Sequence, residues 1–381
     1  MDWIKKDNYG WVDVLRIVAI FAVVWSHVCD DFIAQFNNDR TQFLTGVYLE
    51  SIGRPCVTLL VMVSGWLLLP VRGEYSVGGY YRKRIGRILW PLAFWSIVLP
   101  LVSYAYYVYG NPSTGNPFVD VASYTPQSLG TKLYTWVFNF NVDTIPLWYL
   151  YMLIGLYLAL PIVNGWLRTA TRRDVGTVLI LWGVSLLFPY LRLLATLAGM
   201  TSHSPLGANL WGMCDWNIFH SIYYLSGFMG YMLLAYYLKT WPPRWSWTKT
   251  LLVAVPMYLL GYCGTSFGYI WVNSMFPGQY QYLEIPWLMC GLNVMLQTVG
   301  VFLIFMRLQV KSRPWLSRMA AMMFGIYLCH FPIIQMTYDL YDVSGLPYAL
   351  RIALMALTTF AASYAVTRLL WALPLTRRFV K

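Results

Sequence analysis

The feature that most constrains this chain is a series of long apolar segments, each of the length that an α-helix needs to cross a lipid bilayer. Such a helix takes roughly 17 to 25 residues, and the chain contains ten segments of this kind. They are Val12 to Cys29, Tyr48 to Leu69, Gly86 to Val108, Pro146 to Trp166, Gly176 to Leu197, Trp216 to Leu238, Thr250 to Val272, Pro286 to Met306, Met319 to Tyr338 and Leu346 to Leu370. Only 11% of the residues are charged, against about a quarter in soluble domains. The sequence therefore predicts an all-α integral membrane protein with about ten transmembrane helices.

The distribution of positive charge predicts how the chain crosses the membrane. Cytoplasmic loops of membrane proteins are enriched in Lys and Arg. With both termini in the cytoplasm, 20 of the 27 Lys and Arg residues fall in inner segments, and only Arg40 and Lys132 fall in outer loops. The net charge of +12 is therefore a topology signal and does not point to a nucleic-acid partner. We expect a multi-pass protein with both termini cytoplasmic.

The spans leave no room for a soluble domain, so residues 1–381 are interpreted as a single transmembrane domain. The first span follows Lys5 and Lys6 as a signal peptide would, but no small-residue cleavage site follows it, and we expect it to be retained. The longest loop, residues 110–145, is expected outside and is rich in Gly, Pro, Ser, Thr and Asn.

The aromatic residues and the cysteines also fit a membrane protein. Tryptophan and tyrosine cluster near the span ends, as at Tyr80, Trp241 and Trp245, which favours aromatic belts at the membrane interfaces. The six cysteines contain no CxxC pair, so they are interpreted as small apolar residues and no metal site is expected.

Ionisable side chains inside the first span are candidates for function, because each costs about 2.5 to 3.5 kcal/mol to insert. Asp13 and Arg16 are three residues apart on one helix face and can pair. His27 lies eleven residues beyond Arg16 on the same stripe, roughly 16 Å along the axis. The alternative is a structural Asp–Arg pair with a buried, hydrogen-bonded histidine.

Three further sites stand out along the chain. In the second span, Glu50 and Arg54 can pair with each other, and Ser64-Gly65 is more typical of close helix packing than of chemistry. Before the third span, four cations gather at Arg82, Lys83, Arg84 and Arg87. Arginine forks suit phosphate recognition, although anionic lipid headgroups would attract the same cluster.

A second histidine, His330, is expected in the ninth span at a depth similar to that of His27. Two histidines at matched depth are more suggestive of function than one. His203 and His220 are weaker candidates, because they lie in an outer loop and near the outer end of a span.

Taken together, these segments resemble the acyltransferase 3 family of membrane-bound O-acyltransferases over nearly the whole chain. The residues that carry the resemblance are Asp13-Val14-Leu15-Arg16 with His27, Arg54-Pro55 with Val63-Ser64-Gly65-Trp66-Leu67-Leu68, Arg84-Ile85-Gly86-Arg87-Ile88-Leu89-Trp90-Pro91, Leu147-Trp148-Tyr149-Leu150, and Gly325-Ile326-Tyr327-Leu328-Cys329-His330. Their order and spacing make the combination specific. The resemblance implies a ten-helix inner-membrane fold that moves acyl groups, usually acetyl, from cytoplasmic acyl-CoA onto sugars of surface or lipid-linked glycans.

The chain departs from the family pattern in two ways. Many members have a histidine just before the Leu-Trp-Tyr motif, where Pro146 stands here. The SGNH-type domain that some relatives carry after the last span does not follow it here, so a stand-alone transferase is expected.

The resemblance and the charge layout together suggest a mechanism. The phosphates of acyl-CoA, the donor substrate, dock on Arg84 and Arg87 with help from Arg82 and Lys83, and the arm of the molecule passes Arg16. His27 then acts as general base toward a sugar hydroxyl. Arg54 or His330 stabilises the oxyanion or orients the base. No permanently bound cofactor is expected, and direct transfer is favoured over an acyl-enzyme on Ser26 or Ser64.

Two other classes of protein remain open at this point. A polytopic transporter or flippase for an anionic or lipid-linked solute would also line a pathway with Arg16, Arg54 and the histidines. A structural membrane subunit would use its internal charges only to hold helices together. Thioester cleavage that depends on His27 distinguishes the enzyme from both.

Overall fold

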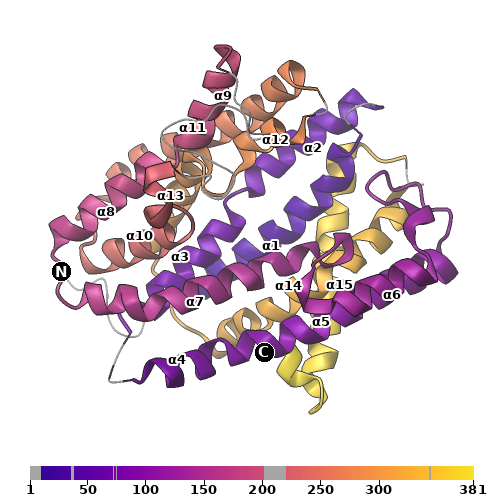
Figure 1. The fold of residues 1–381 in the computed structure, drawn as a ribbon, viewed down its shortest axis with the longest axis horizontal. Helices are drawn as coiled ribbons and strands as arrows, with labels where there is room; N and C mark the ends of the chain where they lie inside the picture. Colours follow the sequence, from indigo (N-terminus) through magenta and orange to yellow (C-terminus); the bar gives the residue numbers. More distant parts are fainter. Residues whose placement is uncertain are drawn as a thin grey trace. The chain divides into compact units, whose positions relative to one another are not determined.

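The computed structural model describes residues 10–35, 38–71, 73, 75–200, 220–277, 279–342 and 345–381. Within these residues the chain is helical, with no strand, and nine segments are long and apolar enough to cross a membrane. They are Gly10–Ile33, Arg40–Leu68, Val77–Gly110, Pro126–Leu167, Arg172–Leu197, Trp247–Met275, Gln281–Arg307, Pro314–Asp342 and Tyr348–Ala372. The structure thus confirms the prediction of an all-α integral membrane protein (Figure 1).

The exposure pattern of α11 (Trp247–Met275) is that of a helix in lipid. Leu252 and Leu260 are exposed, while Thr265 and Ser266 are fully buried. Their hydroxyls donate to the carbonyls of Gly261 and Tyr262 one turn back. Apolar side chains outside and satisfied polar groups inside are expected where the solvent is hydrocarbon.

The chain divides into two compact units, each built from separate stretches of sequence. Unit 1 consists of Met1–Leu15, Arg54–Arg72 and Ile162–Lys311, and unit 2 of Arg16–Gly53, Gly73–Pro161 and Ser312–Lys381. The helices α1 (Gly10–Ile33) and α7 (Trp148–Leu167) therefore contribute residues to both units.

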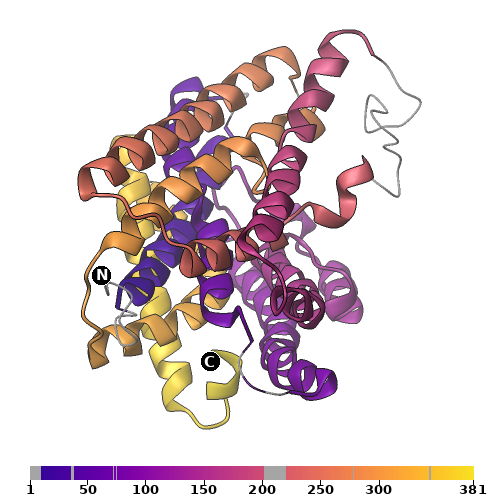
Figure 2. The same cartoon turned by 90° about the vertical axis from the view of Figure 1, so that its left-hand side faces the viewer.

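Unit 1 contains most of the middle of the chain. Its other elements are α3 (Cys56–Leu68), α8 (Arg172–Ser185), α9 (Phe188–Leu197), η5 (His220–Leu225), α10 (Met229–Thr240), α11, α12 (Tyr280–Leu283), η6 (Ile285–Trp287) and α13 (Leu292–Arg307). The helix α11 packs along α13, and the two run alongside each other in both views (Figures 1 and 2). The helix α10 packs on α3, and a Cβ at Gly65 would be only 2.5 Å from the Met232 Cα. The Ser64-Gly65 pair is therefore a close-packing point between these helices.

Unit 2 contains the elements that carry most of the candidate site. They are α2 (Arg40–Gly53), α4 (Val77–Arg84), α5 (Gly86–Ala105), η1 (Tyr106–Gly110), η2 (Val121–Ser123), α6 (Pro126–Thr135), η3 (Trp136–Phe138), η4 (Val142–Leu147), α14 (Pro314–Asp342), α15 (Tyr348–Ala372) and η7 (Arg377–Phe379). The helix α14 packs on α15 and on α5. A Cβ at Gly325 would collide with the Thr367 side chain, so this glycine lets α15 approach α14 closely.

The predicted spans differ from the observed helices in three places. The span Tyr48 to Leu69 is divided into α2 and α3 at Arg54-Pro55, because proline lacks an N–H and disfavours helical geometry in the residue before it. Of the predicted span Trp216 to Leu238, α10 represents only the final part. Within the expected outer loop, residues 110–145, the structure has the helix α6, where no span was predicted.

Some predicted features cannot be compared with the structure. Residues 1–9, 36–37, 72, 74, 201–219, 278 and 343–344 lie outside the described residues, as do the side chains of His220, Ser221 and Tyr280. Lys5, Lys6, Arg72 and His203 therefore stay predictions, as does the role proposed for His220.

Candidate active site

Unit 2 brings together the two histidines that the sequence singled out. His27 on α1 and His330 on α14 have ring centroids 5.4 Å apart, with an angle of 38° between the ring planes. His330 is fully buried, and the side chain of His27 is 19% exposed. His27 is therefore the more accessible of the two rings.

A carboxylate orients the His27 ring. Asp30, one turn further along α1, has its Oδ2 2.9 Å from His27 Nδ1. An ionised carboxylate only accepts hydrogen bonds, so Nδ1 carries the proton and Nε2 holds the free lone pair. Such an arrangement suits a general base, because the acid also stabilises the imidazolium that forms when Nε2 takes up a proton. The i,i+3 spacing of Asp30 from His27 could have indicated this pair from the sequence.

The backbone of α14 orients the His330 ring. Its Nδ1 lies 2.6 Å from the carbonyl oxygen of Tyr327 and must donate to it, so Nε2 is again the lone-pair nitrogen. That Nε2 is buried and has no hydrogen-bond partner among the described residues. Tyr327 is fixed in turn, since its hydroxyl donates to the carbonyl oxygen of Pro146. Pro146, the position where many family members have histidine, thus contributes through its backbone.

Part of the long outer loop is anchored to α14 beyond the histidines. Asn116 is buried, and its Nδ2 donates to Gln335 Oε1 at 2.5 Å. The Phe118 ring packs at 6.2 Å from Phe331, which in turn contacts His27 at 5.7 Å. This link could not be predicted from the sequence, because the loop carries no periodicity that assigns it to a helix.

Polar groups continue on the same side of unit 2. Asp339 accepts hydrogen bonds from the hydroxyls of Tyr106 at 2.6 Å and Thr114 at 2.5 Å. Asp31 is fully buried next to Asp30, and the side-chain amide of Asn116 lies close to its carboxylate. Arg351, which is paired with Asp342 at 2.6 Å, acts on Asp31 electrostatically.

The predicted basic cluster also forms within unit 2. The Tyr157 hydroxyl on α7 is under the electrostatic influence of Arg84, Arg16 and Arg87. Arg84 is half-buried, whereas Arg87 is exposed. The exposed Arg82 and Lys83 complete α4 beside them. Three arginines that the sequence selected from two separate segments therefore all contribute to the electrostatic environment of this phenol.

Arg54 and Asp13 belong to unit 1, whereas both histidines belong to unit 2. Arg54 donates from Nε to the Trp287 carbonyl oxygen at 2.9 Å, and its guanidinium carbon lies 4.9 Å from the centroid of that indole. Asp13 is half-buried at the start of α1. The roles predicted for both residues, and the pairing of Asp13 with Arg16, stay predictions.

Neither serine considered as a nucleophile is paired with a histidine in the described part of the chain. Ser26 donates to Glu50 Oε1 at 2.9 Å, and Ser64 donates to the Leu60 carbonyl oxygen of its own helix at 2.9 Å. Among the described residues, no group of three or more His, Cys, Asp and Glu side chains could hold a metal ion.

The comparisons with known proteins address the chain as a whole. The acyltransferase 3 family model, described as an acyltransferase domain, matches residues 9–368. No curated protein and no solved structure matches the chain. The matched segment includes both histidines and the basic cluster at the start of α5. Because it takes up nearly the whole sequence, this chain belongs to the acyltransferase 3 family of membrane acyltransferases.

Proposed function

We propose that this membrane acyltransferase is an O-acyltransferase of the cell inner membrane. It moves an acyl group, acetyl in the first instance, from cytoplasmic acyl-CoA to a hydroxyl of a surface or lipid-linked glycan. The observation that carries the proposal is the His27–Asp30 pair, in which Asp30 holds Nδ1 and leaves Nε2 ready to accept a proton. The family membership supports acyl transfer in general.

His27 acts as the general base in direct transfer. Its Nε2 takes the proton of the acceptor hydroxyl as that oxygen attacks the thioester carbonyl carbon. The tetrahedral intermediate then collapses, the carbon–sulfur bond breaks, and the imidazolium returns the proton to the thiolate, so the products are an ester and free CoA thiol. Asp30 stabilises the imidazolium between these two steps. Direct transfer also agrees with the hydrogen bonds of Ser26 and Ser64, which do not involve histidine.

His330 is assigned to the acceptor in this scheme. Since its Nδ1 donates to Tyr327, its neutral Nε2 can accept a hydrogen bond but cannot donate one to an oxyanion. It therefore orients the acceptor through a neighbouring hydroxyl of the sugar, because the single proton of the attacking hydroxyl goes to His27, and this refines the earlier expectation of an oxyanion donor. The role of Arg54 in stabilising the oxyanion stays an expectation of the sequence, because Arg54 belongs to the other unit.

The donor is assigned to the arginines around Tyr157. Guanidinium groups bind phosphate through paired, charge-assisted hydrogen bonds, and Arg84 and Arg87 act on the same phenol as Arg16. Arg16 and His27 lie eleven residues apart on α1, which is about 16 Å along the helix. The phosphates of acyl-CoA bind at Arg84 and Arg87, and its arm extends along α1 toward His27.

The test uses purified protein in nanodiscs with radiolabelled acetyl-CoA, with and without candidate glycans. We expect His27→Ala to lower label transfer by about 10² to 10⁴, because the base is removed while the fold is kept. Cys29→Ala, a buried position on the same helix, is the matched control and should keep the activity. Wild-type transfer rates in His27→Ala would exclude His27 as the base. Solute movement without thioester cleavage would favour the transporter alternative.

A further inference from the structure

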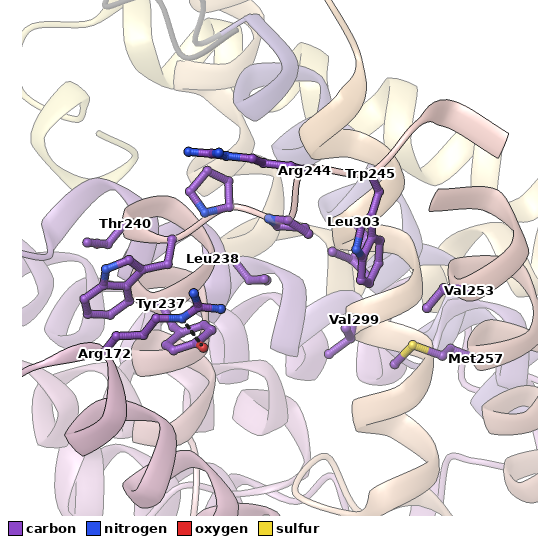
Figure 3. Close-up of a pocket in the computed structure, with 13 residues that line it drawn as sticks. Arg172, Tyr237, Leu238, Thr240, Arg244, Trp245, Val253, Met257, Val299 and Leu303 are labelled. Carbon is purple, nitrogen blue, oxygen red and sulfur yellow. Dashed lines mark hydrogen bonds between the residues drawn. The ribbon is translucent and has the colours of Figure 1, made fainter. Parts of the chain in front are cut away.

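Unit 1 contains a cavity whose volume is far greater than that of a small metabolite. Its volume is about 1330 Å³, and its wall comes from the start of α8, the end of α10, the loop that follows α10, and the facing sides of α11 and α13 (Figure 3). Pockets for drug-sized ligands usually have about 300 to 1,000 Å³. The volume is therefore suited to a larger ligand with an extended apolar part.

The two sides of the cavity differ in chemistry. Arg172 and Arg244 lie on one side, and Val253 and Met257 lie on the other (Figure 3). Val299 and Leu303 of α13 continue the apolar side. A ligand that fits both sides carries a polar group at one end and hydrocarbon at the other.

The polar side of the cavity is suited to binding an anion, because its two arginines have hydrogen-bond donors available for a ligand. Arg172 donates from Nε to the Tyr237 hydroxyl at 3.0 Å, as drawn in Figure 3, which fixes the guanidinium and leaves its two Nη groups for a ligand. Arg244 makes no hydrogen bond or ion pair with the described residues. The acid nearest in sequence, Asp174, is already used, because Thr171 donates to it from both its backbone N–H and its hydroxyl. Two guanidinium groups with free donors suit a phosphate.

The side of the membrane that the cavity is expected to face limits the class of ligand further. The distribution of Lys and Arg predicts that the start of α8 and the loop after α10 face the cytoplasm, where the leaflet carries anionic lipids. Trp241 and Trp245 line the cavity beside the arginines, and tryptophan is typical of the headgroup level. We propose that this cavity binds an anionic phospholipid of the cytoplasmic leaflet, with the phosphate between Arg172 and Arg244 and the acyl chains along α11 and α13.

The proposal is independent of the acyl-transfer site and can be tested separately. The full-length protein is purified and exchanged into detergent that contains either phosphatidylglycerol or phosphatidylcholine with the same acyl chains, and bound lipid is counted by native mass spectrometry. We expect wild type to retain phosphatidylglycerol preferentially. Near an anionic membrane surface each basic residue contributes about 1 kcal/mol, so the double variant Arg172→Gln/Arg244→Gln should bind it about 30-fold more weakly.

Matched controls separate this site from general positive charge. Arg168→Gln/Arg173→Gln removes two exposed cations from the same region that do not line the cavity, and it should leave binding unchanged. Equal loss in the two double variants would overturn the proposal. Equal retention of the two lipids by wild type would also overturn it.

Two competition experiments test whether the bound phosphate belongs to a lipid or to a soluble compound. Soluble glycerol phosphate should not displace the lipid, and neither should acetyl-CoA, because the apolar side of the cavity contributes much of the binding. Displacement by either compound would show that the site is not one for phospholipid. If the arginine variants do not fold, a photoreactive phosphatidylglycerol added to wild type should label residues 237–257, and labelling confined to other segments would contradict the proposal.

Discussion

At the scale of the residue, hydrogen bonds to backbone and carboxylate groups decide what each histidine can do. Asp30 and the Tyr327 carbonyl both hold an Nδ1 atom, so each ring presents an Nε2 lone pair. His27 is partly accessible, while His330 is fully buried. The same side-chain type is therefore suited to proton transfer at one position and to orienting a hydroxyl at the other.

Replacing Asp30 by asparagine tests this reasoning. An amide can donate to Nδ1, which moves the ring proton to Nε2 and removes the lone pair that the base needs. We expect Asp30→Asn to lower kcat for acetyl transfer by about 10² to 10⁴, with little change in the KM for acetyl-CoA. Steady-state kinetics measure both constants, and thermal unfolding checks that the variant is folded. A kcat equal to that of wild type would mean that Asp30 has no role in orienting the base.

At the scale of the element, helix ends hold the groups that we propose bind the charged donor. The segment α4 ends at Arg84, and α5 begins at Gly86, so the basic cluster occupies a helix junction. The backbone stays helical across it, since the N–H of Ile85 donates to the Tyr81 carbonyl oxygen at 2.8 Å. This continuity lets Arg84 and Arg87, three residues apart, act on the same phenol of Tyr157.

The donor site can be tested by removing these two charges together. Arg84→Gln/Arg87→Gln should raise the KM for acetyl-CoA about 10- to 100-fold, because charge-assisted hydrogen bonds to phosphate are lost, while kcat changes little. Arg313→Gln/Arg318→Gln, which removes two other exposed cations of unit 2, is the control. An unchanged KM in the first variant would remove the donor assignment.

A hydrogen bond between two elements makes part of the stability depend on pH. Asp39, just before α2, accepts from the Tyr348 hydroxyl at the start of α15 at 2.6 Å and from the Gln42 backbone N–H at 2.9 Å. These two hydrogen bonds hold the pKa of Asp39 below its ordinary value, and the bond from Tyr348 has the larger effect. Since the pKa is lowered by folding, the contact contributes stability above the ordinary pKa of about 3.9, and this is lost as pH falls through the folded pKa.

Tyr348→Phe removes the hydrogen bond that lowers the pKa of Asp39 the most. We expect a lower Tm than wild type at neutral pH, and a difference that shrinks as the pH falls below about 4. Thermal unfolding in detergent across this range measures the effect. Thr359→Val removes a hydrogen bond between two neutral hydroxyls, Thr337 and Thr359, and its effect should not depend on pH. A Tyr348→Phe difference that is constant with pH would contradict the linkage to Asp39.

At the scale of the whole molecule, the order of spans and the positive charges predict which loops meet the cytoplasm. The outer loop and the chain end after α15 should lie on opposite sides of the membrane. Phe138 and Leu375 are 89% and 83% exposed, so a cysteine at either position can be labelled. In a background without the exposed Cys263 and without Cys214, which lies in a predicted outer loop, Phe138→Cys should react with an impermeant maleimide in intact cells, and Leu375→Cys should react only after permeabilisation. Labelling of both positions in intact cells would reject the predicted topology.

The sequence determined the class of the fold and the identity of most candidate residues. Apolar segments of spanning length are visible without coordinates, because the bilayer sets the length of a helix that crosses it. A buried charge or imidazole in such a segment is equally visible, because it is costly there. This is why Arg16, His27 and His330 could be selected, and why the arginines before α5 stood out.

Only the tertiary structure decided which of these residues meet. It brought His330 to His27, attached Asn116 of the outer loop to Gln335, and assigned Arg54 to a different unit from the histidines. Local spacing specifies which side chains share one helix face, but the contacts that α14 makes with α1 and with the outer loop join residues about 220 to 300 positions apart. Such contacts depend on how whole helices pack, and packing is a property of all their side chains together, which no short segment of sequence contains.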